Sequence, residues 1–397
     1  MLYRPTGSKL KPIGGSVHRG VVLLFAVAAG TAVATIYFAQ PLLVTMGADL
    51  GIAASTVGGI VTLTQLGYGL GLFLLVPLGD LLDRRRLVAG MLASLAIAEL
   101  VAATAANGVV LLAGMAAIGV LAVVTQLLVA FAASLAAPAE RGRVVGLVTT
   151  GVVLGILLAR TVSGTLADLA GWRAVYVVSA GVTVVIAVVL YRVLPGAVPA
   201  GAGMSYGRLL RSTLSLFIEE RVFRTRGTLA LLIFAAFGTL WSSVALPLSE
   251  DGLSHTAIGA FGLAGAAGAL AAAPAGRLAD RGRARWTTGM ALSLLLLSWV
   301  PLGFTRTSLW ALVAGAVLLD LAVQAVHVTS QTLIYPLRPD AGSRLIGGYM
   351  IFYSVGSGIG AIGSTAVYAV AGWTGVCLLG AGFSALALIV WSVRAAR

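Results

Sequence analysis

The chain has 397 residues, of which 59% are hydrophobic and only 10% are charged. Soluble globular domains average about 45–50% apolar and about 25% charged residues, so this composition excludes a disordered protein and most soluble enzymes. The formal net charge is +13. In so apolar a chain this excess indicates basic loops on one side of a lipid bilayer rather than binding of nucleic acid.

Metal and disulfide chemistry is not indicated by the sequence. Cys377 is the single cysteine, and the three histidines (His18, His255 and His327) are far apart in the chain. A disulfide framework needs pairs of cysteines, and a metal site needs clustered ligands. We therefore expect no metal and no cofactor.

Twelve apolar stretches are long enough to cross a bilayer, which takes about 20 helical residues. Lipid offers the backbone no hydrogen-bond partner, so each is expected to be helical. With the N-terminus in the cytoplasm, all 26 Lys and Arg residues except Arg160, Arg173 and Arg306 fall in cytoplasmic segments, as the positive-inside rule requires. The sequence thus predicts an all-α membrane protein with both termini inside and spans at 20–46, 55–77, 87–106, 109–136, 144–167, 174–194, 228–248, 257–275, 286–304, 310–336, 345–370 and 373–392.

Two motifs occur once in each half of the chain. A Gly-x-x-x-Asp-Arg loop at 79–84 recurs at 276–281, and a Gly-Trp pair at 171–172 recurs at 372–373. Such repeats are typical of transporters built from two parallel six-helix bundles with a site between them. We expect a cytoplasmic arm at 1–19, pseudo-symmetric bundles at 20–194 and 228–397, and a linker at 195–227.

The repeated loop resembles the signature G-x-x-x-D-R-x-G-R-R of the major facilitator superfamily, although the glycine after the arginine is missing from the first copy. This resemblance covers the whole chain and implies secondary active transport by alternating access. It also implies a gating loop in which Asp83 latches the two halves at the cytoplasmic side, partly by facing a helix N-terminus. The matching residues are Gly79, Asp83 and Arg84 in the first copy, and Gly276, Asp280 and Arg281 in the second.

The linker contains apolar residues at helical spacing with arginines between them, from Tyr206 to Arg226. This pattern predicts an amphipathic helix on the cytoplasmic surface, with a solvated regulatory arm as the alternative.

Polar side chains within apolar helices are costly and are functional candidates. In the tenth span four polar side chains share one helical face: Asp320, Gln324, His327 and Gln331. The family resemblance implies that the first, fourth, seventh and tenth helices line the central cavity. Asp320 and His327 are therefore candidate proton-coupling residues. The alternative is a polar stripe that satisfies neighbouring helices. The other cavity candidates from these helices are Gln324, Gln331, Thr125, Gln126, Tyr37, Gln40 and Trp241.

Arg160 and Glu99 are charged residues in the fifth and third spans. The segment around Arg160 resembles the antiporter motif of proton-linked exporters, but arginine stands where that motif has proline. Arg160 needs an anion, which could be Glu99, Asp320 or a substrate. Glu99 is a further proton-coupling candidate, or it pairs with Arg160 near the outer rim.

Together these features predict a non-enzymatic transporter, working as a monomer in a bacterial plasma (inner) membrane. Proton-coupled efflux of a small organic compound, such as a drug, sugar or metabolite, is expected from the resemblance to the antiporter branch of the family, with the proton as coupling ion. Uptake or exchange of an organic anion bound by Arg160 is the alternative. A membrane sensor that does not transport is the alternative from another class.

Overall fold

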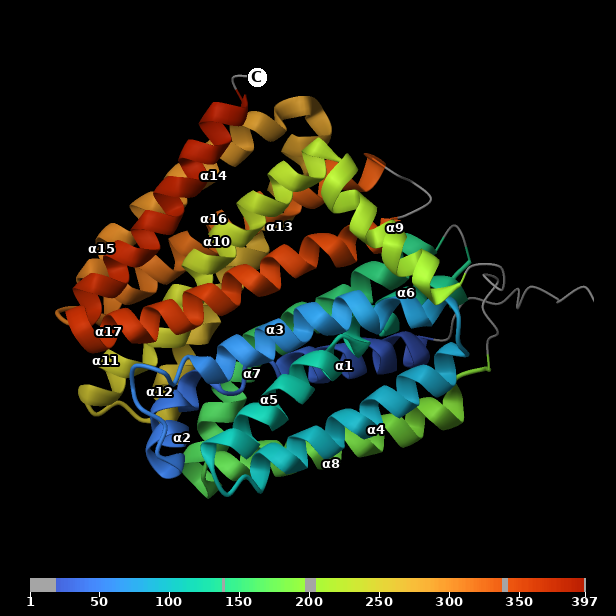
Figure 1. The fold of residues 1–397 in the computed structure, drawn as a ribbon, viewed down its shortest axis with the longest axis horizontal. Helices are drawn as coiled ribbons and strands as arrows, with labels where there is room; N and C mark the ends of the chain where they lie inside the picture. Colours follow the sequence, from blue (N-terminus) through green and yellow to red (C-terminus); the bar gives the residue numbers. More distant parts are fainter. Residues whose placement is uncertain (1–18, 138–139, 197–204, 338–341, 396–397) are drawn as a thin grey trace, which may run out of the picture.

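The computed structural model describes residues 19–137, 140–196, 205–337 and 342–395, and all regular elements within these ranges are helical (Figure 1). In chain order they are α1 (Arg19–Ala34), η1 (Gln40–Leu42), α2 (Leu43–Leu50), α3 (Gly59–Leu74), η2 (Val76–Asp80), α4 (Arg84–Ala103), α5 (Gly108–Ala122), α6 (Val124–Leu135), α7 (Arg141–Ala170), α8 (Trp172–Val193), α9 (Tyr206–Glu219), α10 (Arg221–Ser243), α11 (Ala245–Glu250), α12 (His255–Ala260), η3 (Phe261–Gly265), α13 (Ala266–Leu278), η4 (Ala279–Arg283), α14 (Ala284–Leu297), α15 (Trp299–Gly303), α16 (Leu309–Ile334), η5 (Tyr335–Leu337) and α17 (Gly342–Ala395).

Nine helical stretches of the described chain are long and apolar enough to cross a membrane, and α1 is a shorter apolar helix. Two of the nine are 49 residues long. One contains Gly282 with φ of 75°, and the other contains Gly372 with φ of 58°. Glycine adopts these positive angles without steric cost, so the chain turns there without a longer loop. The prediction of an all-helical, membrane-spanning chain is confirmed, while the count of twelve and the orientation stay predictions.

The first predicted span is not one continuous helix, so this part of the prediction is wrong. Helix α1 ends at Ala34, the chain passes through turns, and a 3₁₀ turn begins at Gln40. Pro41 has no N–H to give, and its ring crowds the carbonyl of the residue four positions earlier, which is Tyr37. The seventh predicted span is interrupted in the same way, between Ser243 and the short helix α11 that contains Pro247.

The same pattern of helix packing occurs twice. In the first half α1 packs on α7, α3 on α5, and α4 on α8. In the second half α10 packs on α17, α13 on α16, and α14 on α17. Helix α3 also packs along α17, and α7 packs on α12 and η3, so these two seams join the halves. The predicted division of the chain into two bundles is compatible with this packing.

The amphipathic helix of the linker is α9. It ends at Glu219 rather than at Arg226, and α10 begins immediately afterwards, at Arg221 instead of 228. Leu209 and Leu216 of α9 are buried, and the hydroxyl of Tyr206 donates a hydrogen bond to the carbonyl of Leu74 at 2.7 Å. The helix therefore packs across one end of the bundles. Residues 1–18 of the predicted arm and 197–204 of the linker lie outside the described residues.

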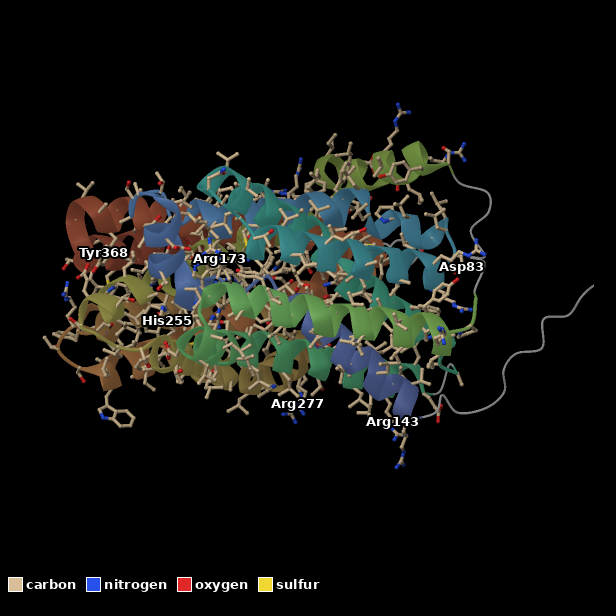
Figure 2. All side chains as sticks on the ribbon, turned by 90° about the horizontal axis from the view of Figure 1, so that it is seen from below. Asp83, Arg143, Arg173, His255, Arg277 and Tyr368 are labelled. Carbon is tan, nitrogen blue, oxygen red and sulfur yellow. The ribbon has the colours of Figure 1, made fainter. Side chains whose placement is uncertain are left out.

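Arginines gather at one end of the molecule, where residues 84–86 begin α4, Arg141 and Arg143 begin α7, and α9 carries Arg208 and Arg211. We call the end at which α4, α7 and α9 begin or cross the arginine-rich end, and the end formed by α2, α11 and α12 the opposite end (Figure 1). Figure 2 shows Asp83 and Arg143 toward the arginine-rich end, and Arg173, His255 and Tyr368 toward the opposite end.

Candidate substrate cavity

A cavity of about 560 Å³ lies between the two halves. Residues from α1 and the turn after it, α3, α6, α7, α10, α13, α16 and α17 line it, so more helices contribute than the four implied by the family resemblance. From Arg160 it extends along α7 toward the arginine-rich end as far as Gly146. Its polar lining residues are Tyr37, Tyr68, Gln126, Thr149, Thr150, Arg160, Asp320, Gln324, His327 and Tyr353.

Arg160 is buried at the cavity wall, where neutral groups contact its side chain and the carboxyl group of Asp320 lies near enough to interact with it electrostatically. Its Nε donates a hydrogen bond of 2.5 Å to Oε1 of Gln40. Its guanidinium carbon lies 4.1 Å from the ring centre of Trp241 and 5.3 Å from that of Tyr37. Nη2 is buried without a hydrogen-bond partner. The break in the first span places Gln40 and Tyr37 where they can reach this arginine.

Asp320 is buried on the same wall. Its Oδ1 accepts a hydrogen bond of 3.1 Å from the indole N–H of Trp241, whose ring also faces Arg160. A side chain at Gly265 or Gly268 would collide with Asp320, so α13 packs closely on α16 here. Gly265 and Gly268 thus act as the small residues that close helix contacts require.

His327 and Gln331 form a polar group nearer the arginine-rich end of α16. The amide nitrogen of Gln331 lies 3.2 Å from Nε2 of His327, and Nδ1 lies 3.1 Å from the hydroxyl of Tyr349. His327 lines the cavity, but Gln331 does not. The structure thus brings Asp320, Gln324 and His327 to one cavity wall, as their shared helical face predicts.

One pair of tyrosines connects the two halves across the cavity, since the hydroxyls of Tyr37 and Tyr353 are 2.5 Å apart. Within the first half, the amide nitrogen of Gln126 donates to the hydroxyl of Tyr68 at 3.2 Å. Thr125, the neighbour of Gln126, does not line the cavity and donates to the carbonyl of Ala29 at 3.3 Å.

Glu99 lies elsewhere. Its carboxylate is fully buried between α4 and α8, where Oε1 accepts a hydrogen bond of 2.5 Å from the hydroxyl of Ser179. It does not line the cavity, and none of the ion pairs among the described residues joins it to Arg160. The suggested Glu99–Arg160 pair at the outer rim is therefore wrong.

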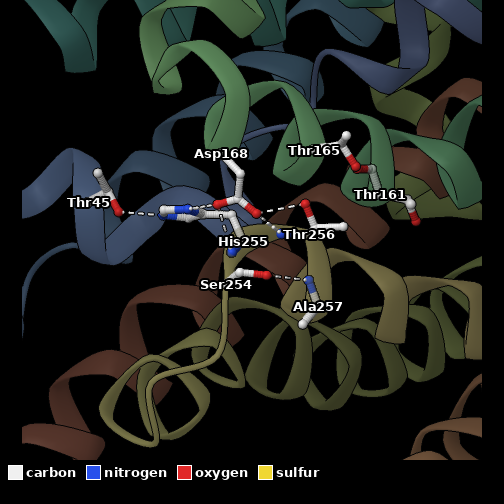
Figure 3. A network of polar contacts seen from close by, with 8 residues as sticks. All are labelled: Thr45, Thr161, Thr165, Asp168, Ser254, His255, Thr256 and Ala257. Atoms are coloured by element: carbon white, nitrogen blue, oxygen red, sulfur yellow. Dashed lines mark hydrogen bonds and ion pairs between the residues drawn. The ribbon is translucent and has the colours of Figure 1, made fainter.

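The opposite end is closed by a polar network between the halves (Figure 3). The Asp168 carboxylate of α7 accepts hydrogen bonds from the backbone N–H groups of His255 and Thr256, at 3.1 and 2.8 Å, at the start of α12. It also contacts the His255 ring at 2.7 Å, and that ring contacts the hydroxyl of Thr45 at 2.6 Å. Beside this network, Gly164 packs directly on the backbone of His255.

A second polar cluster at the opposite end belongs to the first half alone. Asp49 accepts hydrogen bonds from the guanidinium of Arg173 and, at 3.0 Å, from the indole N–H of Trp172. The bonds from Arg173 first, and then from Trp172, lower the pKa of the Asp49 carboxyl below its usual value. This cluster holds α2 against the start of α8.

The loop that carries the family signature makes local contacts. Asp83 accepts a hydrogen bond of 3.0 Å from the N–H of Arg86 and so caps α4, while Arg84 donates to the carbonyl of Gly79 at 2.9 Å. In the second copy Asp280 and Arg281 are exposed, next to the turn at Gly282, and Gly276 lies near Val328. The latching role implied for Asp83 stays a prediction.

Several aromatic residues of the wall were not predicted from the sequence. Phe234 and Phe237 of α10 line the cavity together with Tyr68 and Tyr353. The one indication in the sequence that these rings line the cavity was their position on helices that pair across the halves. Aromatic residues are so common in apolar helices, however, that this indication is not specific.

These observations define a class: helical, membrane-spanning proteins with a polar-lined cavity between two halves. The family model of the Major Facilitator Superfamily matches residues 22–238 and 227–397, so the chain belongs to this superfamily of transporters.

Known relatives agree with this assignment. Over 373 residues, covering 94% of both chains, the protein is 46% identical to YgaY of Escherichia coli, an uncharacterized transporter. It is 34% identical, over 96% of its length and 89% of the relative, to a protein of Streptomyces coelicolor described as a probable transporter.

Solved structures share the fold at low identity. A bacterial homologue of the human lysosomal transporter Spinster, in an inward-facing and occupied conformation, superposes with a TM-score of 0.76 at 14% identity, over 95% of this chain and 96% of that one. The human organic anion transporter MFSD10 superposes with a TM-score of 0.67 at 19% identity, over 94% and 99%.

Proposed function

We propose that this transporter exports a small organic compound across a bacterial inner membrane by alternating access and couples this movement to protons. The observation that supports it best is Asp320, a buried carboxyl group on the wall of the cavity between the halves. Protonation changes its charge and thus its interactions with Trp241 and the nearby Arg160. A ligand shifts a conformational equilibrium only by binding the two states differently, and a proton on Asp320 can do so.

In the proposed topology the chain has twelve spans with both termini in the cytoplasm, and it functions as a monomer. Dividing the two 49-residue stretches at Gly282 and Gly372 makes eleven spans of the nine long stretches, and α1 is the twelfth. The positive-inside rule orients the arginine-rich end toward the cytoplasm. The cavity extends toward that end while the opposite end is closed, so the conformation described is open inward.

Export is favoured by the resemblance of the loop at 79–86 and the segment at 151–173 to exporter motifs. Uptake or exchange of an organic anion is the second candidate. Arg160, which replaces the proline of the antiporter motif, supports it, because its Nη2 is buried without a partner.

The first test is transport in liposomes that contain a pH-sensitive dye, with drugs, sugars and organic anions added one at a time. We expect one compound to change the internal pH. Asp320→Asn should bind that compound but lose proton-driven accumulation.

Glu99→Gln is the matched control, because it neutralises a buried carboxyl that lies outside the cavity and preserves an acceptor for Ser179. It should keep the pH response. Proton-driven flux in Asp320→Asn would contradict the assigned coupling residue, and binding without flux in the unmodified protein would indicate a sensor.

A further inference from the structure

We infer that the transported compound is a monovalent organic anion bound by Arg160, and that the anion and the coupling proton occupy the cavity together. This inference rests on the proposed function and specifies its substrate class and the relative direction of the two fluxes.

Arg160 has an incomplete set of hydrogen-bond partners. Gln40 accepts the hydrogen bond from Nε, and Trp241, Tyr37 and Phe237 surround the guanidinium with ring faces. None of these partners carries a negative charge. None of the ion pairs among the described residues includes Arg160, and its Nη2 has no acceptor. Asp320 lies near enough to interact with Arg160 electrostatically but forms no ion pair with it, so the guanidinium can still take an anion that enters from the cavity.

The cavity also limits the shape of the anion that Arg160 can bind. A guanidinium offers parallel N–H groups that match a carboxylate or sulfonate. The cavity wall includes the aromatic rings of Phe234, Phe237, Tyr68 and Tyr353. A volume of about 560 Å³ lies within the range of drug-sized ligands. A ring-containing compound with one acidic group fits both features.

The charges on the cavity wall determine how an anion and a proton influence each other's binding. The titratable groups on its walls are Arg160 of α7, Asp320 and His327 of α16, and the tyrosines Tyr37, Tyr68 and Tyr353. With neutral histidine and tyrosines, a charged Arg160 and a charged Asp320 balance each other. An added monovalent anion leaves one excess negative charge, and protonation of Asp320 removes it.

Anion and proton therefore bind with positive cooperativity, since each makes the other's site more favourable. Both then cross in the same direction, so export of the anion is driven by the gradient of the compound and moves a proton outward against the inward proton gradient. A proton that competed with the substrate would instead give antiport.

The test uses proteoliposomes with an internal pH dye and the membrane potential clamped at zero. The compounds are ring scaffolds of graded size, each offered as a sulfonate, a sulfonamide and a trimethylammonium derivative. Sulfonates stay ionised, so a proton that moves with them is carried by the protein. An inward gradient of a transported sulfonate should acidify the interior, whereas antiport would make it alkaline. Protein-free liposomes report leakage.

Two variants separate the roles of the charges. Arg160→Lys keeps the positive charge but loses the fork, and it should raise the KM for sulfonates roughly tenfold. Asp320→Asn imitates the protonated state, so it should exchange labelled for unlabelled sulfonate without a pH change. Thermal unfolding confirms that both variants fold.

The outcomes distinguish this inference from the proposed function. Transport of sulfonamides or ammonium compounds in preference to sulfonates, or an alkaline response, overturns the anion–proton inference while proton-coupled transport stands. If no compound of any class moves or changes the pH, the proposed function fails as well.

Discussion

The two ends of the interface between the halves are closed to different degrees. Along the seam of α3 and α17 contact continues over most of the length, as at Thr62, whose hydroxyl donates to the carbonyl of Gly358 at 2.8 Å. Along the seam of α7 with α12 and η3, close contact is confined to the opposite end, around Gly164 and Asp168. Nearer the arginine-rich end the same seam borders the cavity. The conformation is therefore determined mainly by one end of one seam, and contacts within either half should not alter it.

The largest effect is expected from Gly259→Ala in α12. A Cβ atom at this position would collide with the backbone carbonyl of Arg160, so the opposite end cannot close as it does here. Overpacking costs about 1–3 kcal/mol, which corresponds to a shift of roughly 5- to 150-fold in the population of closed molecules. Transport should fall accordingly, and a cysteine at Ile258 should react faster with an impermeant maleimide.

Gly181→Ala in α8 is the control for this change, because a Cβ there meets no neighbouring atom. It should leave transport and labelling unchanged. Equal losses in both variants would show that the comparison of the seams is wrong.

The next effect is expected from Asp168→Asn. The amide keeps one acceptor but loses the charge that faces His255 and two backbone N–H groups. Hydrogen bonds to charged groups contribute about 1.5–3 kcal/mol. The population of molecules that are open at the opposite end should therefore rise about tenfold or more. The maleimide rate at a cysteine in place of Ile258 measures this gain. Glu250→Gln is the control, since Glu250 pairs with Arg306 inside the second half at 3.2 Å.

A smaller effect is expected from Thr45→Val, which removes a single contact, that of the hydroxyl with the His255 ring at 2.6 Å. One neutral hydrogen bond contributes about 1 kcal/mol, so the population should shift by roughly a factor of five. Thr45→Ser retains the hydroxyl and should behave like the unmodified protein in the same labelling assay.

The smallest effect is expected at Asp49, whose partners all belong to the first half. Because its pKa is lowered in the folded state, the stability it contributes is present above the usual value of 3.8 and is lost as the pH falls through the lowered pKa. Asp49→Asn should lower the thermal stability at neutral pH, and this variant should lose less stability in acid than the unmodified protein does. The maleimide rate at a cysteine in place of Ile258 should not change. A changed labelling rate would show that ties within one half also affect the conformation.

Much of the fold could be predicted from the sequence, because apolar length, loop charge and the repeated Gly-Trp pair have direct physical causes. Gly171 and Gly372 both have positive φ, of 81° and 58°, so the repeat reflects a backbone turn that glycine favours. The grouping of Asp320, Gln324 and His327 could be predicted for a similar reason, since helical spacing fixes a common face.

The rest depended on distances between helices. Glu99 and Asp320 are both single acids in apolar helices, and the sequence does not show that one faces Ser179 and the other the cavity. Trp241 could be named as a candidate, but its bridge between Arg160 and Asp320 needs three helices in place. The interruption of the first span follows from Pro41, because proline cannot donate the hydrogen bond that would continue the helix.

The hydrogen bond between Tyr37 and Tyr353 has a mechanical consequence. Along α17, Tyr353 lies between Gly347 near the signature loop and Ala361, which packs on Gly58 toward the opposite end. A tie at such an intermediate height acts as a fulcrum. Rotation about it displaces atoms in proportion to their distance from it, so a few degrees can exchange the open and closed ends while the two hydroxyls stay in contact.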